Sequence, residues 1–207
     1  MQIAMRSVLR EILMVAGLVL CITHSALAEE GKYYVGLSVG QSKFKDACAD
    51  LDPSNGFVGN CKDTDTAFKI FGGAHFTRNW GGEFAYVDFG KATANGTFLG
   101  TPATARTKVN GLAVDATGAL PLGDQFSVFA KLGLLGWRVD SNAALSGLGN
   151  NSQSASGSSL TYGIGAQFDF TKAFGVRAEW EHFDKVGDDS TGKSAIELGT
   201  IGIVYKF

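Results

Sequence analysis

The sequence is poor in proline, cysteine and histidine, with three of each among 207 residues. No apolar run approaches the roughly 20 residues that a membrane-spanning helix needs. The net charge is -2, so the protein lacks the excess of basic residues that is typical of proteins that bind nucleic acid. Glycine and phenylalanine are abundant instead, at 28 and 15 residues. This composition favours closely packed strands over a helical bundle.

The first 28 residues have the pattern of a secretory signal peptide. Two arginines precede the short apolar run at 12–22, and Ala26-Leu27-Ala28 offers small residues at the cleavage positions. We therefore expect Sec-type export and cleavage after Ala28, which leaves 29–207 as the mature domain.

Beyond this segment, eight runs alternate apolar side chains with small or polar ones. The runs span residues 33–40, 68–76, 83–87, 112–120, 126–134, 162–170, 174–181 and 200–207. An alternation of period two is typical of strands with one apolar face. The sequence thus predicts an all-β fold of eight antiparallel, up-and-down strands.

The connections between these runs alternate in length. Three are short, at 77–79, 122–125 and 171–173, and the longer polar ones lie at 44–64, 92–105, 141–157 and 187–192. This alternation is typical of transmembrane barrels of the outer membrane. Because no backbone polar group can stay unpaired in hydrocarbon, the last run must pair with the first. The aromatic residues expected at the membrane interface near the short turns are Tyr33, Phe76, Trp80, Phe126, Phe170, Phe174, Tyr205 and Phe207.

A soluble eight-stranded barrel is the alternative, because periodicity alone does not say which face points inward. In such a barrel the apolar face would line the interior and the polar face would meet water. Here the polar face carries mostly Gly, Ser and Thr, which suit a narrow interior, whereas the bulky apolar face suits lipid. We therefore favour the membrane barrel.

Two cysteines follow the predicted signal peptide, Cys48 and Cys61. In an exported protein an even number of cysteines predicts a disulfide. This bridge would close a loop of about 14 residues and contribute roughly 3 kcal/mol in the chain-entropy model. Without a neighbouring histidine the pair makes a poor metal site, and no cofactor is expected.

The runs resemble the OmpA-like transmembrane domain family. The resemblance is carried by "YYVGLSVG", "GGEFAYVDFGKA", "VRAEWEHFD" and the terminal "GIVYKF". It implies an eight-stranded outer-membrane barrel with roles in envelope integrity and surface contact. Full-length relatives carry a peptidoglycan-binding domain after the barrel, but this sequence stops at Phe207, so the resemblance does not extend to peptidoglycan binding. Gly202, Tyr205 and Phe207 resemble the signal read by the outer-membrane assembly machinery.

The resemblance also implies ion pairs inside the barrel. Glu83 and Arg177 match one family pair. The second family pair falls on the uncharged residues Thr117 and Gln167. Lys131 and Glu179 are the other inward charges, and we expect them to pair with each other. Mutual pairing that plugs the interior is expected over a working ion gate, because unpaired buried charges are costly.

The sequence therefore predicts a structural outer-membrane protein in contact with lipid, with periplasmic termini and outward-facing long loops that contact surface ligands. A small ion-conducting pore, gated at Glu83 and Arg177, is the alternative. An enzyme is not expected: the histidines after the signal peptide, His75 and His182, lie in no nucleophile motif.

Overall fold

The computed structural model describes residues 32–49, 51, 53–147 and 149–207, and the predicted signal peptide lies outside them. The strands are β1 (Tyr33–Phe44), β2 (Phe57–Lys62), β3 (Thr64–His75), β4 (Trp80–Phe98), β5 (Thr101–Pro121), β6 (Phe126–Leu145), β7 (Gly149–Asp169), β8 (Phe174–Val186) and β9 (Ser194–Lys206). One short 3-10 helix, η1 (Pro53–Asn55), precedes β2. Within the described residues, no helix has the length and apolar character needed to cross a membrane.

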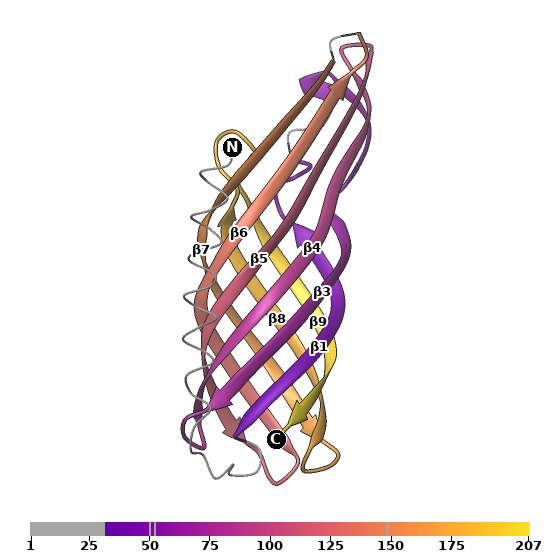
Figure 1. Cartoon of the computed structure of the whole chain (residues 1–207). Coiled ribbons are helices and arrows are strands. Elements are labelled where there is room, and N and C mark those ends of the chain that lie inside the picture. The colour runs from indigo at the N-terminus through magenta and orange to yellow at the C-terminus, as the bar shows by residue number, and fades with distance from the viewer. Residues whose placement is uncertain (1–31, 50, 52, 148) are drawn as a thin grey trace. The chain divides into compact units, whose positions relative to one another are not determined.

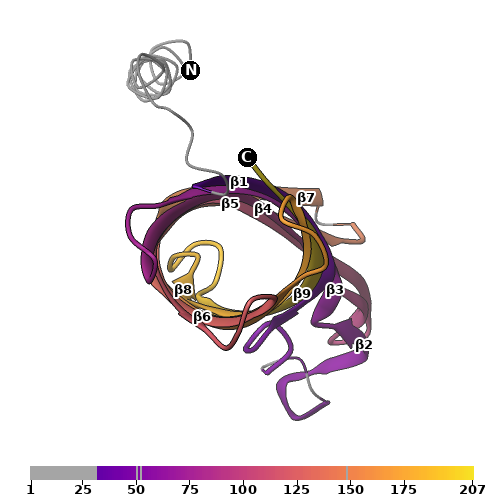
Figure 2. The same cartoon turned by 90° about the horizontal axis from the view of Figure 1, so that it is seen from below.

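Eight of these strands close into an antiparallel barrel (Figures 1 and 2). Neighbouring strands follow the order β4-β3-β1-β9-β8-β7-β6-β5, and β5 pairs back onto β4. Closure depends on β1 and β9, whose register runs from Tyr34 opposite Lys206 to Phe44 opposite Ile196. The predicted fold and the pairing of the first run with the last are confirmed.

The apolar face points outward. On β1, Val35, Leu37 and Val39 are 47%, 55% and 45% exposed, whereas Tyr34 and Ser38 at the alternate positions are buried. The same alternation continues around the barrel. The soluble alternative is therefore wrong, because it would expose the polar face and bury the apolar one.

Short turns and both described ends of the chain share one end of the barrel, here called the short-turn end (Figure 1). The aromatic residues predicted for this region contact one another: the rings of Phe174 and Tyr205 lie 5.0 Å apart and those of Tyr205 and Phe207 5.9 Å apart. The ring of Phe207 also stacks on Tyr33 at 6.2 Å. These contacts make an exposed aromatic belt across the seam between β1 and β9.

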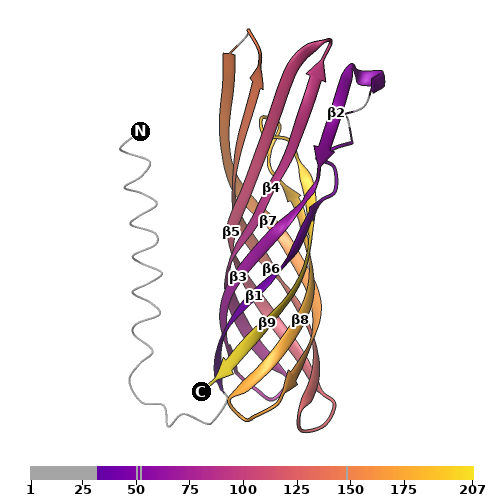
Figure 3. The same cartoon turned by 90° about the vertical axis from the view of Figure 1, so that its right-hand side faces the viewer.

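The opposite end, here called the hairpin end, differs from the prediction. The segments 92–105 and 141–157 were expected as polar connections, but most of their residues continue the strands as two long hairpins, β4–β5 and β6–β7 (Figure 3). Their described turn residues are 99–100 and 146–147. In the β6–β7 hairpin most side chains on both faces are exposed or half-buried, whereas Ala92 and Ala94 of the β4–β5 hairpin are buried. The alternation of large apolar side chains that marks the membrane part of the strands is absent from both hairpins.

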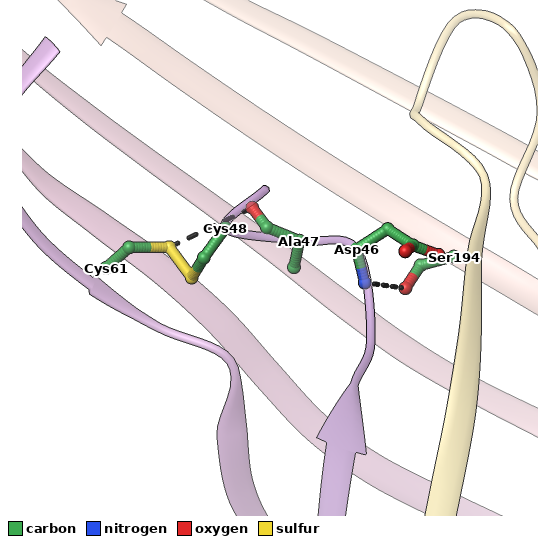
Figure 4. The surroundings of a disulfide bond; sticks show 5 residues. All are labelled: Asp46, Ala47, Cys48, Cys61 and Ser194. Carbon is green, nitrogen blue, oxygen red and sulfur yellow. Dashed lines mark hydrogen bonds between the residues drawn. A yellow bond between two sulfur atoms is a disulfide. The ribbon is translucent and has the colours of Figure 1, made fainter. Parts of the chain in front are cut away.

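The first long connection is also structured, because β2 pairs with the upper part of β4. The expected disulfide joins Cys48 to Cys61 and fixes the chain before β2 to β2 itself (Figure 4). Next to it, the backbone N–H of Asp46 donates to Ser194 Oγ at 3.1 Å. Lys45 also bonds Glu197 at 2.7 Å. This connection is thereby held to the start of β9.

Candidate functional site

The interior of the barrel contains a layer of buried charge, which is the candidate functional site. Strands β3, β4, β5, β6 and β8 each contribute inward-facing side chains to it. Among the described residues, the buried charged ones are Lys69, Glu83, Asp115, Lys131, Arg177, Glu179 and Glu181. We call these seven residues the charged layer.

Arg177 connects the β8 wall to the opposite side of the barrel. Its Nη1 donates to Glu83 Oε2 at 2.5 Å and to Glu179 Oε1 at 3.1 Å. Its Nε donates to Gln167 Oε1 at 3.1 Å. The structure therefore brings Glu83 and Arg177 into contact, and Gln167 acts as a neutral acceptor for the same guanidinium. Tyr34 adds a further bond, donating from its hydroxyl to Glu83 Oε2 at 3.0 Å.

Lys131 contacts three carboxylates at once. Its Nζ lies 3.1 Å from Glu83, 3.2 Å from Glu179 and 2.7 Å from Glu181. Lys131 and Glu179 thus meet, as the sequence led us to expect, but not as an isolated pair. Lys69 bonds Glu179 and also Glu181, the latter at 2.7 Å. The buried cations and glutamates form one connected network.

Sequence reasoning did not include Lys69 and Glu181 among the paired charges. Both lie within the alternating runs, at positions whose side chains are predicted to face inward. The sequence therefore predicted which side of the wall they occupy. Which inward charges meet depends on how far each strand is staggered against the next around the barrel. In the structure, that stagger brings Lys69 of β3 to Glu181 of β8.

Aromatic rings surround the Arg177 guanidinium. Its central carbon lies 4.5 Å from the Phe129 ring centroid, 4.8 Å from Phe71 and 5.0 Å from Tyr34. A cation above an aromatic face is attracted by the ring quadrupole, most strongly where water is excluded. The rings therefore hold the guanidinium in place and fill space around it.

A second layer, made of large apolar side chains, lies between the charged layer and the hairpin end. The rings of Phe89 and Phe183 meet edge to face at 4.8 Å. We call the following residues the apolar layer, each 0–1% exposed: Val87, Phe89, Leu135, Val139, Phe183, Ile196 and Leu198. The sequence led us to expect small polar residues throughout the interior, and this was wrong for the upper half. Val87 and Phe89 stand at alternating positions whose side chains are predicted to face inward, and this pattern could have predicted the apolar layer.

Other predicted residues lie on the wall. Gly202 of β9 sits so close to the carbonyl of Leu37 on β1 that a Cβ would clash with it. Tyr205 and Phe207 point outward in the aromatic belt and are 43% and 51% exposed.

The two candidate histidines pack against tyrosines on separate parts of the wall. The ring of His75 lies 5.2 Å from that of Tyr34. His182 stacks on Tyr162 at 4.9 Å.

The last connection, between β8 and β9, is organised by Asp188. Its Oδ1 accepts from the backbone N–H of Ser190 at 3.0 Å and of Thr191 at 2.9 Å. It also accepts from both of their hydroxyls, at 2.7 and 2.9 Å. These bonds stabilise the ionised form and lower the pKa of Asp188 to about 2.

Arg177→Ala is expected to lower the free energy of unfolding by about 3 kcal/mol, because Glu83 and Glu179 lose a buried partner. Urea unfolding of the refolded barrel measures this change. Lys45→Ala, which breaks the more exposed pair with Glu197, is the matched control and should cost less than about 1 kcal/mol. Equal effects of the two variants would contradict the importance of the buried network.

The stabilisation of the β8–β9 loop by ionised Asp188 should be lost only in strong acid. Because the pKa of Asp188 is lower in the folded protein, its ionised carboxylate stabilises the loop above the pKa of the unfolded chain. This stabilisation disappears as pH falls through about 2. Carbon NMR of the Asp188 carboxyl group would follow this titration. Ser190→Ala combined with Thr191→Val should raise the midpoint, and Ser152→Ala in the other hairpin should leave it unchanged. A midpoint that the double variant does not move would refute the assignment.

Solved structures that superpose on this chain include natural outer-membrane barrels. Ail of Yersinia pestis superposes with a TM-score of 0.54 at 18% identity, covering 86% of this chain and 99% of Ail. Neisserial surface protein A gives a TM-score of 0.55 at 11% identity, covering 87% of this chain and 100% of that one. At these identities the likeness shows the fold alone.

Sequence relatives point the same way. Outer membrane protein A of Shigella flexneri is 23% identical over 88% of this chain and 50% of its own length. The Klebsiella aerogenes protein is 25% identical with the same coverage. The chain therefore spans about half the length of these curated relatives. A family model for the OmpA-like transmembrane domain matches residues 28–207. Since that match covers most of the chain, the protein belongs to the family of OmpA-like transmembrane domains, which are integral barrels of the outer membrane.

Proposed function

We propose that this outer-membrane barrel is a closed structural scaffold, which supports envelope integrity and presents its hairpin end for contact at the cell surface. The filled interior is the observation that carries the proposal. The charged layer and the apolar layer are both buried, and they succeed each other along the barrel axis.

The apolar layer argues most strongly against free passage of ions. An ion that crosses it would lose its water without gaining a polar partner, at a cost of many kcal/mol. Phe89 and Phe183 reach across this part of the interior from β4 and β8. The barrel wall is therefore supported from within.

The proposed orientation places the hairpin end outside the cell and both termini in the periplasm, after export and removal of residues 1–28. Long connections outside and short turns in the periplasm are the general pattern of outer-membrane barrels. Cys48 and Cys61 lie at the hairpin end, where an oxidising environment would keep their disulfide intact. Gly202, Tyr205 and Phe207 on β9 would serve the assembly machinery during insertion.

The proposed contact surface is the sheet formed above the barrel by β2, β4, β5, β6 and β7. Ail, which shares the fold, has been crystallised in complex with the heparin analogue sucrose octasulfate. In this chain the β6–β7 hairpin, residues 141–161, carries no charged side chain. Its Ser, Asn and Gln residues favour a neutral partner bound through hydrogen bonds over a sulfated one.

The second candidate function is a small ion-conducting pore. Glu83 contacts both Arg177 and Lys131, so it has two cationic partners between which its bonds could be exchanged. Such an exchange would rearrange the charged layer without leaving a charge unpaired. The apolar layer would still have to open.

Single-channel recording in planar bilayers separates the two functions. We expect no openings from the parent protein or from Arg177→Ala, and conductance from the double variant Phe89→Ala/Phe183→Ala, which removes the two facing rings of the apolar layer. Leu132→Ala on the lipid-facing side of the wall is the matched control. Discrete openings in the parent that change in Arg177→Ala would instead establish the gated pore.

A shortened hairpin tests the surface role. Replacing residues 141–153 by Asn-Gly joins Asp140 to Ser154, which already face each other across β6 and β7. We expect this variant to restore detergent resistance to cells that lack the protein, because the barrel is intact. Purified in nanodiscs, it should lose binding to a neutral glycan array that the parent binds. Failure to restore resistance would contradict an envelope role that resides in the barrel.

A further inference from the structure

One carboxylate of the charged layer has no partner. Asp115 of β5 is 3% exposed, yet neither of its side-chain oxygens forms a hydrogen bond within the described part of the chain. The other six members balance: Lys69, Lys131 and Arg177 stand against three glutamates that they contact directly. Asp115 is therefore a fourth acid in a layer with three cations.

The surroundings of Asp115 make this surplus costly. Glu83 lies directly opposite on β4, and like charges facing each other across strands are destabilising. Lys131 of β6 is near, but its three N–H donors are matched by Glu83, Glu179 and Glu181. Glu181 of β8 and Lys69 of β3 are the remaining charged groups that face Asp115. None of these supplies a positive charge that is not already shared among glutamates.

A second unpartnered oxygen lies in the same row of the barrel as Asp115. Its neighbour on β6 is Gly133, and Asp115 Oδ1 occupies the space that a Cβ on Gly133 would take. Beyond Gly133 in the same row, on β7, is Thr161. Thr161 is 0% exposed, and its Oγ1 also has no partner among the described residues. Three unpaired oxygens thus flank one glycine.

We propose that Asp115 and Thr161 form a binding site for a single positive charge, either an alkali-metal ion or a proton. One such charge brings the layer to four cations against four acids, whereas a divalent ion would leave an excess. Carboxylate and hydroxyl oxygens are suitable ligands for a hard alkali-metal ion, with Thr161 as the neutral one. A proton would need Asp115 alone. Phe183 on β8 lies directly opposite Thr161 in the same row, and Leu135 lies two residues from Gly133 on the same face of β6. Both side chains belong to the apolar layer, are 0% exposed and exclude water.

The test measures urea unfolding of the refolded protein in Na⁺ or K⁺ against N-methylglucamine at constant ionic strength. The large organic cation cannot enter the barrel. If an alkali-metal ion binds, each tenfold rise in its concentration above the dissociation constant lowers the unfolding equilibrium constant tenfold, or about 1.4 kcal/mol. Asp115→Asn and Thr161→Val should both abolish this dependence. Asp124→Asn, in an exposed short turn, is the matched control and should keep it.

The proton is distinguished by infrared spectroscopy of the folded parent in N-methylglucamine. A protonated Asp115 gives the carbonyl-stretch band of a carboxylic acid, which Asp115→Asn removes and which Thr161→Val and Asp124→Asn retain. This measurement needs only the parent to be folded. The proposal is overturned if the parent shows neither the alkali-metal dependence nor the band, because Asp115 would then be an unpaired anion or be bonded only to water.

Discussion

Hydrogen bonding of the backbone is the constraint on which the whole structure depends. A lipid-facing wall cannot leave N–H or C=O groups unpaired, so β1 and β9 must meet along their lengths although they lie at opposite ends of the chain. Closure brings Tyr33 against Phe207 and Gly202 against Leu37. It also fixes the diameter of the barrel, and with it how much side-chain volume the interior must take up.

The interior solves that packing problem in two ways. In the charged layer, polar side chains are long enough to reach partners on other strands, and each cation contacts more than one glutamate. In the apolar layer, Phe89 and Phe183 pack as residues do in the core of a soluble protein. The first arrangement gives specific contacts and the second excludes water. Together the two layers stabilise the barrel wall from its interior.

Much of the fold could be predicted because alternation is a local property. The period of two in runs such as 33–40 and 126–134 gave the strands and, with lipid as solvent, their outward faces. The contact between Glu83 and Arg177 came from family resemblance. The partnership of Lys69 with Glu181, the unpaired state of Asp115 and the upper apolar layer depend on strand stagger, which no single run encodes. The hairpins were missed as strands because neither carries an alternation of large apolar side chains with polar ones.

Two strands of the wall, β4 and β8, each shift register against a neighbouring strand, and these shifts bear on how the chain tolerates changes in length. They lie between Asp88 and Lys91 on β4 and between Phe183 and Val186 on β8, near the level where the ring gives way to the hairpins. Below them, inserting one residue would turn every following side chain to the opposite face and send charge into lipid. Above them, in the β6–β7 hairpin, most side chains on both faces are exposed or half-buried, so an added residue turns no charge toward lipid. We therefore expect insertions and deletions to be tolerated above the register shifts, whereas the number of residues in the wall strands below them cannot change.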